Sequence, residues 1–108
     1  HCSDYHGLCA ALGRALGYPT RVTYGINTFA KNSPSHCKLE AYLPPYGWVC
    51  FDVSETQRVI EAIEKDKALA ADKKAELVRL AHDRLQKGFR DNTWLQLTRG
   101  TDYELVPP

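Results

Sequence analysis

The spacing of apolar residues at the start of the chain predicts an amphipathic helix. Apolar side chains recur at three- and four-residue steps through residues 3–16, which is the period of one face of a helix. Ser3 and Asp4 lie in the expected first turn, where short polar side chains and negative charge are favoured. Gly17 and Pro19 follow as a C-terminal stop. The apolar stripe that we expect along this helix consists of Tyr5, Leu8, Cys9, Leu12, Ala15 and Leu16.

Three extended segments follow the helix. Residues 20–26 are β-branched and aromatic and predict a strand, whereas residues 27–34 have the composition of a surface loop. Residues 36–43 alternate imperfectly as a second strand, and residues 48–53 predict a third. The turn sequence at 44–47 joins the last two strands, so we expect a β-hairpin there.

The register of this hairpin decides whether His36 and Asp52 lie on the same face of the sheet. Directly opposed residues of an antiparallel pair share a face. A turn centred on Pro44 places His36 opposite Asp52, and a turn centred on Pro45 keeps both on one face with a diagonal offset. A centre between the two prolines puts His36 and Asp52 on opposite faces. Convergence of the two side chains therefore depends on the register.

The region near 55–87 reads as a helical insert. Ser54 and Gln57 form a capping-box pattern that predicts a helix start directly after the third strand. The charged, alanine-rich stretch 65–74 is either a continuous solvated helix or a break at which Asp72 caps a new helix. Apolar spacing, with His82 on the same stripe, then resumes to about residue 87, where Gly88 ends the helix.

The end of the chain reads as a second hairpin. Residues 93–98 and 103–106 have strand composition, and the polar segment 99–102 between them predicts a turn.

Composition describes an ordinary small globular domain. The chain has 108 residues, of which 44% are hydrophobic and 25% charged, with a net charge of +1. That charge gives no reason to expect a nucleic-acid partner, and no apolar run is long enough to span a membrane. The chain contains no methionine, and its first residue adjoins a candidate nucleophile. We therefore expect residues 1–108 to be one core domain that forms the C-terminal portion of a longer protein or domain.

Four cysteines invite a disulfide or metal interpretation. They lie at Cys2, Cys9, Cys37 and Cys50, without a CxxC pair or a zinc-finger spacing. A domain of this composition does not need disulfides to fold, so we expect Cys9, Cys37 and Cys50 to be free and mostly buried thiols. A metal site formed by Cys2, His6 and Cys9 on one helical face is the alternative. We favour the interpretation without a metal or cofactor.

Cys2, His36 and Asp52 are the candidate catalytic residues. The helix dipole and the unpaired amides of a helix N-terminus stabilise a thiolate, and a nearby imidazolium lowers the thiol pKa further. The Cys2 amide also lies where the oxyanion of a tetrahedral intermediate would form. Asp52 would accept a hydrogen bond from the far nitrogen of His36 and so orient the ring. These are the parts of a thiol nucleophile with its base and the group that orients the base.

Three ordered motifs resemble the transglutaminase-like superfamily of bacterial proteins. The first is HCSDYHGL followed by LGYPTRV, the second SHCKLEAYLP and the third YGWVCFDVSE. The closing segment WLQLTRGTDYELVPP is also similar to endings common in these proteins. The motifs cover about half of the chain, at residues 1–8, 16–22, 35–44, 46–55 and 94–108.

The resemblance implies an α+β fold with a cysteine-protease-like (papain-like) core. The helix that carries Cys2 would pack on an antiparallel sheet, and Cys2, His36 and Asp52 would be nucleophile, acid–base and orienting residue. It also implies that a second oxyanion donor lies N-terminal to the cysteine, before His1. We therefore expect activity from the longer protein rather than from this piece alone.

Four further residues near these motifs are candidates for the cleft. His1 flanks the nucleophile as a cleft residue or an exposed terminus, and His6, one turn from Cys2, could compete with His36 as the base. The direction of the helix argues against that competition. Lys38 stands where the family often has tryptophan and could form part of the cleft wall, and Trp48 is a core residue or a substrate platform. The candidate substrate-binding residues are His1, Lys38 and Trp48.

We expect thiol-dependent acyl transfer at an amide or peptide bond through a thioester. Hydrolysis, as in a peptidase or amidase, is favoured because no glutamine-donor or lysine-acceptor pocket is evident. A protein-crosslinking transglutaminase and a catalytically inactive binding module are the alternatives. The expected partner is a peptide or protein amide substrate, and the sequence indicates neither a compartment nor an oligomeric state.

Overall fold

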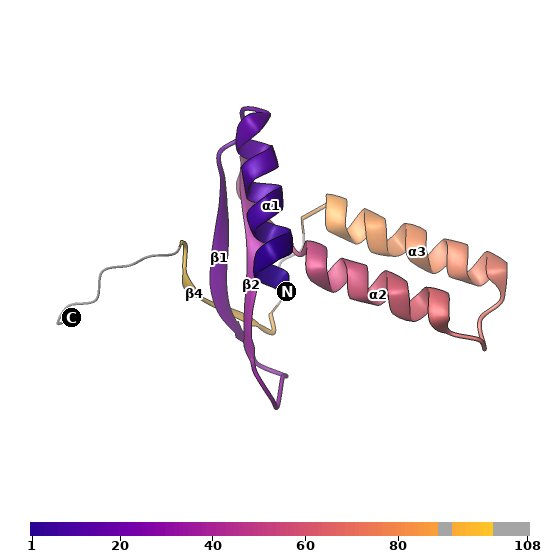
Figure 1. Cartoon of the computed structure of the whole chain (residues 1–108). Coiled ribbons are helices and arrows are strands. Elements are labelled where there is room, and N and C mark those ends of the chain that lie inside the picture. Colours follow the sequence, from indigo (N-terminus) through magenta and orange to yellow (C-terminus); the bar gives the residue numbers. More distant parts are fainter. Residues whose placement is uncertain (89–91, 101–108) are drawn as a thin grey trace.

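The computed structural model describes residues 1–88 and 92–100. A helix packs against a four-stranded antiparallel sheet, and a helical hairpin projects to one side near the start of that helix (Figure 1). The strand order in the sheet is β3-β2-β1-β4. The elements are α1 (Cys2–Ala15), β1 (Thr20–Asn27), β2 (Ser35–Leu43), β3 (Gly47–Phe51), α2 (Val53–Lys65), α3 (Ala71–Gln86) and β4 (Trp94–Thr98).

The predicted α+β class, the first helix and the three central strands are confirmed within one or two residues at most boundaries. The first strand of the predicted terminal hairpin is β4, which pairs antiparallel with β1. Its predicted partner at 103–106 lies outside the described residues. Within the described part of the chain, no helix combines the length and the apolarity needed to cross a membrane.

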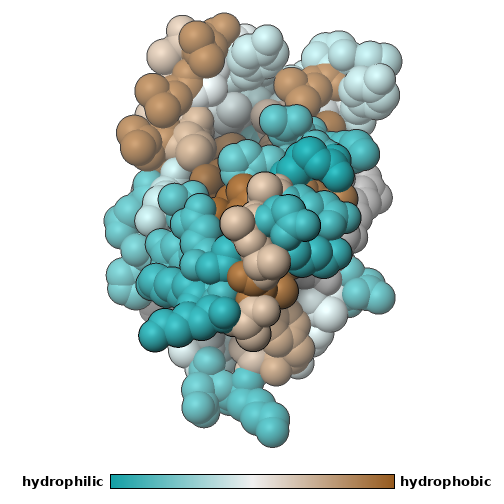
Figure 2. All heavy atoms as spheres, turned by 90° about the vertical axis from the view of Figure 1, so that its right-hand side faces the viewer, coloured by the Kyte–Doolittle hydropathy of each residue, from teal (hydrophilic) through white to brown (hydrophobic). Residues whose placement is uncertain are grey.

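The buried face of α1 is not the predicted apolar stripe. His6 and Ala10 are the buried residues of the helix, whereas Leu8, Leu12 and Leu16 are exposed. Figure 2 shows the corresponding apolar surface at the upper left, over α1. The stripe prediction therefore located the helix correctly and its inward face wrongly.

A close approach between α1 and β1 explains which face turns inward. The Thr20 hydroxyl donates a 2.6 Å hydrogen bond to the Ala10 carbonyl. A Cβ atom on Gly13 would lie 2.5 Å from Thr20 Cγ2. Only small side chains fit along this contact, so the face with Ala10 and Gly13 lies on the sheet and the larger leucines point outward.

The β2–β3 hairpin is centred on Pro45. Leu39 pairs with Phe51 and Tyr42 with Trp48, so the positions pair symmetrically about residue 45. The register centred on Pro44 is therefore wrong, and the alternative centred on Pro45 is confirmed. This register keeps the His36 and Asp52 positions on one face, with the predicted diagonal offset.

Helix α2 begins at a different cap from the one predicted. Strand β3 ends at Phe51, and Asp52 is the N-cap residue, with extended backbone angles. Its Oδ1 accepts a 2.9 Å hydrogen bond from the Glu55 amide and a 3.2 Å hydrogen bond from the Ser54 hydroxyl. Ser54 thus supports the cap instead of forming it, because the aspartate two residues earlier reaches the free amides first.

The helical insert is an antiparallel pair that projects away from the sheet (Figure 1). The helical segment is interrupted between α2 and α3. Ala70, and not the predicted Asp72, is the N-cap of α3, and Asp72 lies inside the first turn of that helix. Gly88 follows α3 with a φ of 68°, as its predicted role of helix stop requires. His82 is exposed, not half-buried on an apolar stripe. Figure 2 shows this end of the molecule as a narrow apolar band between hydrophilic side chains.

Candidate active site

The structure brings Cys2, His36 and Asp52 together at the N-terminal end of α1. Cys2 is the first residue of that helix, His36 lies near the start of β2, and Asp52 lies between β3 and α2. His36 Nε2 is 2.7 Å from Asp52 Oδ2. Cys2 and His36 line the same cleft, and each charge shifts the pKa of the other group. Because Nε2 faces the carboxylate, Nδ1 is the nitrogen left for the thiol.

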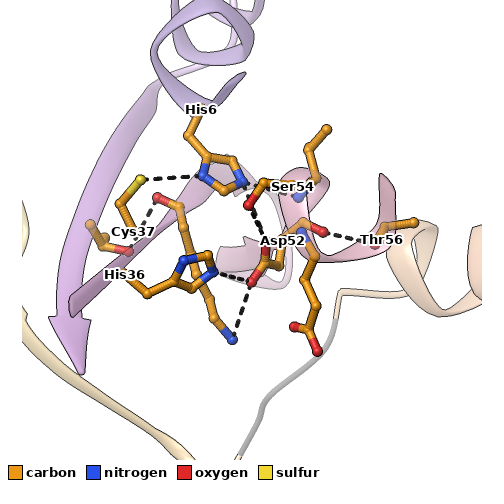
Figure 3. A network of polar contacts seen from close by, with 10 residues as sticks. His6, His36, Cys37, Asp52, Ser54 and Thr56 are labelled. Atoms are coloured by element: carbon orange, nitrogen blue, oxygen red, sulfur yellow. Dashed lines mark hydrogen bonds and ion pairs between the residues drawn. The ribbon is translucent and has the colours of Figure 1, made fainter. Parts of the chain in front are cut away.

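Asp52 is held from several sides. The carboxylate accepts hydrogen bonds from His36, from the Ser54 hydroxyl and from the Glu55 amide (Figure 3). Burial alone would raise its pKa, but the hydrogen bonds from His36 and the Glu55 amide outweigh it and lower the pKa of Asp52 to about 2. The charges of His36 and Lys38 act in the same direction. Asp52 is therefore an anion that can orient the imidazole.

The pKa shifts of Cys2 and His36 favour a thiolate–imidazolium pair. Burial opposes ionisation of Cys2, but hydrogen bonds from the Cys37 thiol and amide and the charge of His36 lower the Cys2 pKa below that of an ordinary thiol. The hydrogen bond to Asp52 is the largest effect on His36 and raises its pKa, with the charges of Asp52 and Cys2 acting in the same sense and burial opposing. Both shifts increase the fraction of the charged pair.

Cys37 is a neighbouring thiol with the opposite tendency. Its side chain is 1% exposed, and burial, followed by the hydrogen bond to Cys2, raises its pKa to about 12. The site thus places the negative charge on Cys2 and keeps Cys37 as a neutral donor. All four cysteines are free thiols, as the sequence predicted.

Trp94 contacts His36 from β4, a strand that β1 separates from β2 in the sheet. The two rings meet edge to face, with centroids 5.8 Å apart and an interplanar angle of 87°. Strand β4 carries Trp94 and pairs it with Asn27 of β1. Trp94 was not among the residues predicted for the site, because a contact between residues 58 positions apart leaves no signal in local spacing.

His6 contacts the same cluster but is fully engaged. Its Nδ1 is 3.5 Å from Cys37 Sγ, and its Nε2 accepts a 3.0 Å hydrogen bond from the Val53 amide. Neither ring nitrogen is therefore left for a substrate proton or for the alternative metal site with Cys2 and Cys9. Across residues 1–88 and 92–100, no group of three or more His, Cys, Asp or Glu side chains is arranged to hold a metal ion.

Two clefts open on either side of Cys2. The larger has a volume of about 530 Å³ and extends over the β1–β2 loop, and the smaller has a volume of about 210 Å³ and extends between α1 and α2. His1, Cys2 and Arg58 line both. Other lining residues include Asn27, Phe29, Ser35, His36 and Glu55 in the larger cleft and Tyr5, Ser54, Gln57 and Glu61 in the smaller.

The three candidate substrate-binding residues lie in different places. His1 lines both clefts, so its role stays a prediction. Lys38 is 1% exposed, with Nζ 3.8 Å from Asp52 Oδ2 and 5.0 Å from the centroid of the Trp94 ring. It is therefore buried behind the site and cannot form an open cleft wall.

Trp48 lies near the turn end of the β2–β3 hairpin, outside the described lining of both clefts. It stacks against Tyr42 with ring centroids 5.6 Å apart, and the Arg21 guanidinium lies 3.8 Å above its ring. Because Trp48 is 36% exposed, the interpretation as a core residue is wrong, and a role as a substrate platform stays a prediction.

Comparison with known proteins agrees with the fold. Residues 1–53 match the family model of the transglutaminase-like superfamily. This segment contains α1, the three strands β1 to β3, and all three candidate catalytic residues. No curated protein and no solved structure gives a significant match. Residues 1–53 therefore belong to the transglutaminase-like superfamily.

Proposed function

We propose that this protein catalyses thiol-dependent acyl transfer at an amide or peptide bond, with Cys2 as nucleophile, His36 as acid and base, and Asp52 as the orienting residue. The 2.7 Å contact between Asp52 and His36, with His36 beside Cys2 in one cleft, is the observation that carries the proposal. Family membership supports it, because superfamily members use a cysteine-protease-like core. The direction of the pKa shifts at Cys2 and His36 gives independent chemical support.

The reaction proceeds in two balanced steps. The Cys2 thiolate attacks the carbonyl carbon, and the tetrahedral oxyanion that forms is stabilised by the Cys2 amide, one of the helix N–H groups without an intrahelical acceptor. The C–N bond then breaks, and the His36 imidazolium donates its proton to the leaving amine. The product of this step is a Cys2 thioester with a neutral His36.

Resolution of the thioester regenerates the enzyme. Neutral His36 takes a proton from water, whose oxygen attacks the thioester carbonyl, and the Cys2 thiolate leaves. The acid is released, and the thiolate–imidazolium pair is restored. Hydrolysis is the favoured outcome because two clefts open beside Cys2 and admit water to the thioester.

Site-resolved alkylation tests the activation of Cys2. The full-length protein is treated with a limiting amount of iodoacetamide near neutral pH, and each cysteine is quantified by peptide mass spectrometry. We expect Cys2 to react much faster than Cys9, which is also partly exposed and serves as the internal control. The His36→Ala variant should remove the difference. Equal slow labelling of both thiols in the wild-type protein would contradict the proposal and favour an inactive binding module.

Competition between water and an amine tests the hydrolytic assignment. The protein is acylated with p-nitrophenyl acetate, and the released acyl group is followed with and without added methylamine. Acetate should remain the main product at millimolar methylamine. Efficient formation of N-methylacetamide would contradict hydrolysis and favour a crosslinking transglutaminase.

A further inference from the structure

His6 is a buried histidine that the proposed reaction does not use. Its side chain is fully buried on the inner face of α1, one helical turn after Cys2. Figure 3 shows the ring between Cys37 on one side and the start of α2 on the other. Its Nδ1 lies 3.5 Å from Cys37 Sγ, and its Nε2 lies 3.0 Å from the Val53 amide nitrogen.

The hydrogen bonds fix the protonation state of His6. A backbone N–H can only donate, so the Nε2 that receives the Val53 amide must carry a lone pair. The proton of the neutral ring is then on Nδ1, from which it is donated to Cys37 Sγ. Burial is the largest effect on His6 and lowers its pKa. The nearby cations of His36 and Lys38 also lower it, whereas the charge of Asp52 raises it. The 3.7 Å approach of Nε2 to Asp52 Oδ1 is therefore a contact of a neutral ring.

This single ring joins the three elements that carry the candidate catalytic residues. His6 shares α1 with Cys2. Cys37 directly follows His36 on β2, and Val53 directly follows Asp52 at the start of α2. The two hydrogen bonds thus connect the nucleophile helix to the backbone neighbours of both the base and the orienting residue. The His36 ring also meets His6 edge to face, with centroids 6.4 Å apart.

We propose that His6, as a neutral Nδ1–H tautomer, is a positioning residue that sets the spacing between Cys2, His36 and Asp52. The proposal rests on the proposed function of those three residues. His6 does not touch the substrate or transfer a proton. Its acceptor bond to the Val53 amide positions the Asp52 segment, and its donor bond to Cys37 positions the His36 segment against α1.

Two amide variants separate the two bonds. The amide of glutamine overlaps the position of histidine Nε2, so His6→Gln can keep an acceptor for Val53. The amide of asparagine overlaps Nδ1, so His6→Asn can keep only the donor to Cys37. His6→Leu removes both bonds at similar volume. The exposed His82→Leu on α3 is the matched control.

The readout is the pH profile of Cys2 alkylation in the full-length protein. Charged and titratable groups from three elements surround the Cys2–His36 pair. They are His1 and Asp4 at the N-terminal end of α1, Cys37 and Lys38 on β2, and Asp52, Glu55 and Arg58 at the start of α2. None is altered in these variants. We expect His6→Leu and His6→Asn to shift the alkylation midpoint to higher pH and to reduce the rate near neutral pH between about tenfold and a hundredfold. His6→Gln should retain most of the wild-type rate and midpoint.

A purely structural role predicts a different result. In that case the variants lower the thermal unfolding midpoint but leave the pH midpoint of Cys2 alkylation unchanged in the folded protein, and this outcome overturns the proposal. Equal loss in His6→Gln and His6→Leu would also overturn it, because the acceptor bond to Val53 would then have no role.

The tautomer can be measured without any variant. Long-range ¹H–¹⁵N correlation spectra of the wild-type protein should show a protonated Nδ1 and an unprotonated Nε2 for His6 at the pH at which an ordinary histidine is half protonated, in keeping with its lowered pKa. A proton on Nε2, or titration of His6 near the pH of an ordinary histidine, overturns the proposal. This result does not depend on catalysis, so it remains informative if Cys2 proves to be unreactive.

Discussion

Asp52 binds His36 with the same carboxylate that caps helix α2. Oδ2 is 2.7 Å from His36 Nε2, while Oδ1 accepts the Glu55 amide at 2.9 Å. The orienting residue is thus fixed by the end of β3 on one side and by the first turn of α2 on the other. The helical hairpin is therefore tied to the site through its cap as well as through the cleft residue Arg58.

Asp52→Asn should separate the two roles of this carboxylate. Asparagine is an equally good N-cap, so the cap should be kept, whereas loss of the charge removes the effect that holds His36 as an imidazolium and, near neutral pH, roughly 2 kcal/mol of stability. We expect the rate of acyl transfer to fall by about a hundredfold or more. Asp52→Ala should lose the same activity and, in addition, about 1 kcal/mol of stability from the missing cap. Steady-state rates and urea unfolding of both variants check this, and an Asp52→Asn protein with wild-type activity would contradict it.

The lowered pKa of Asp52 predicts acid sensitivity of the fold. Its folded pKa of about 2 lies below the ordinary value of 3.8, so the unfolded state takes up the proton first as the pH falls. The stabilisation is complete above about pH 4 and is lost as the pH falls through about 2. The difference corresponds to roughly 2 kcal/mol, and it should be absent from Asp52→Asn. Urea unfolding of both proteins between pH 2 and 6 measures it, and parallel curves would refute the assignment.

The raised pKa of His36 predicts the opposite dependence at higher pH. Its contribution to stability is fully present below the ordinary histidine pKa and is lost as the pH rises through the raised folded value. The alkaline limb of the rate profile should follow the same group, because the imidazolium is the acid that protonates the leaving amine. Direct titration of the His36 ring by NMR should give a pKa above the ordinary histidine value, and a pKa below that value would be inconsistent with the ion pair.

Gly13 should be intolerant of a side chain, and Gly7 offers a matched control in the same helix. A Cβ on Gly13 would lie 2.5 Å from Thr20 Cγ2, and Thr20 is held by its hydrogen bond to Ala10. Gly13→Ala should therefore destabilise the protein by about 1–3 kcal/mol, despite the better helix propensity of alanine. No described atom lies within 4 Å of a Cβ built on Gly7, so Gly7→Ala should be neutral or stabilise by up to about 1 kcal/mol. Thermal unfolding compares the two, and equal effects would count against the close helix–strand contact.

Local sequence patterns predicted the structural features that depend on short-range spacing of residues along the chain. The first helix and the β2–β3 hairpin could be predicted, because helical spacing, strand alternation and one turn determine them. The convergence of His36 with Asp52 depended on a register that the sequence left open. The family resemblance, which rests on ordered motifs, was confirmed by the match over residues 1–53. The catalytic roles themselves stay predictions.

Features that depend on tertiary contacts could not be predicted. The inward face of α1 follows from a close approach at Gly13, not from its apolar stripe. Lys38 is buried although lysine is rarely found in cores, because the anionic Asp52 and the face of Trp94 lie beside it. Trp94 reaches His36 through the pairing of β4 with β1, which no local pattern encodes.

Detection of an acyl-enzyme on Cys2 tests the central claim most directly. The full-length protein is mixed with p-nitrophenyl acetate, quenched in acid and mapped by peptide mass spectrometry. We expect an acetyl thioester on Cys2 that forms rapidly and then decays, slow formation in His36→Ala, and none on that position in Cys2→Ala. Acetylation of other residues with an unmodified Cys2 in the wild-type protein would contradict the account.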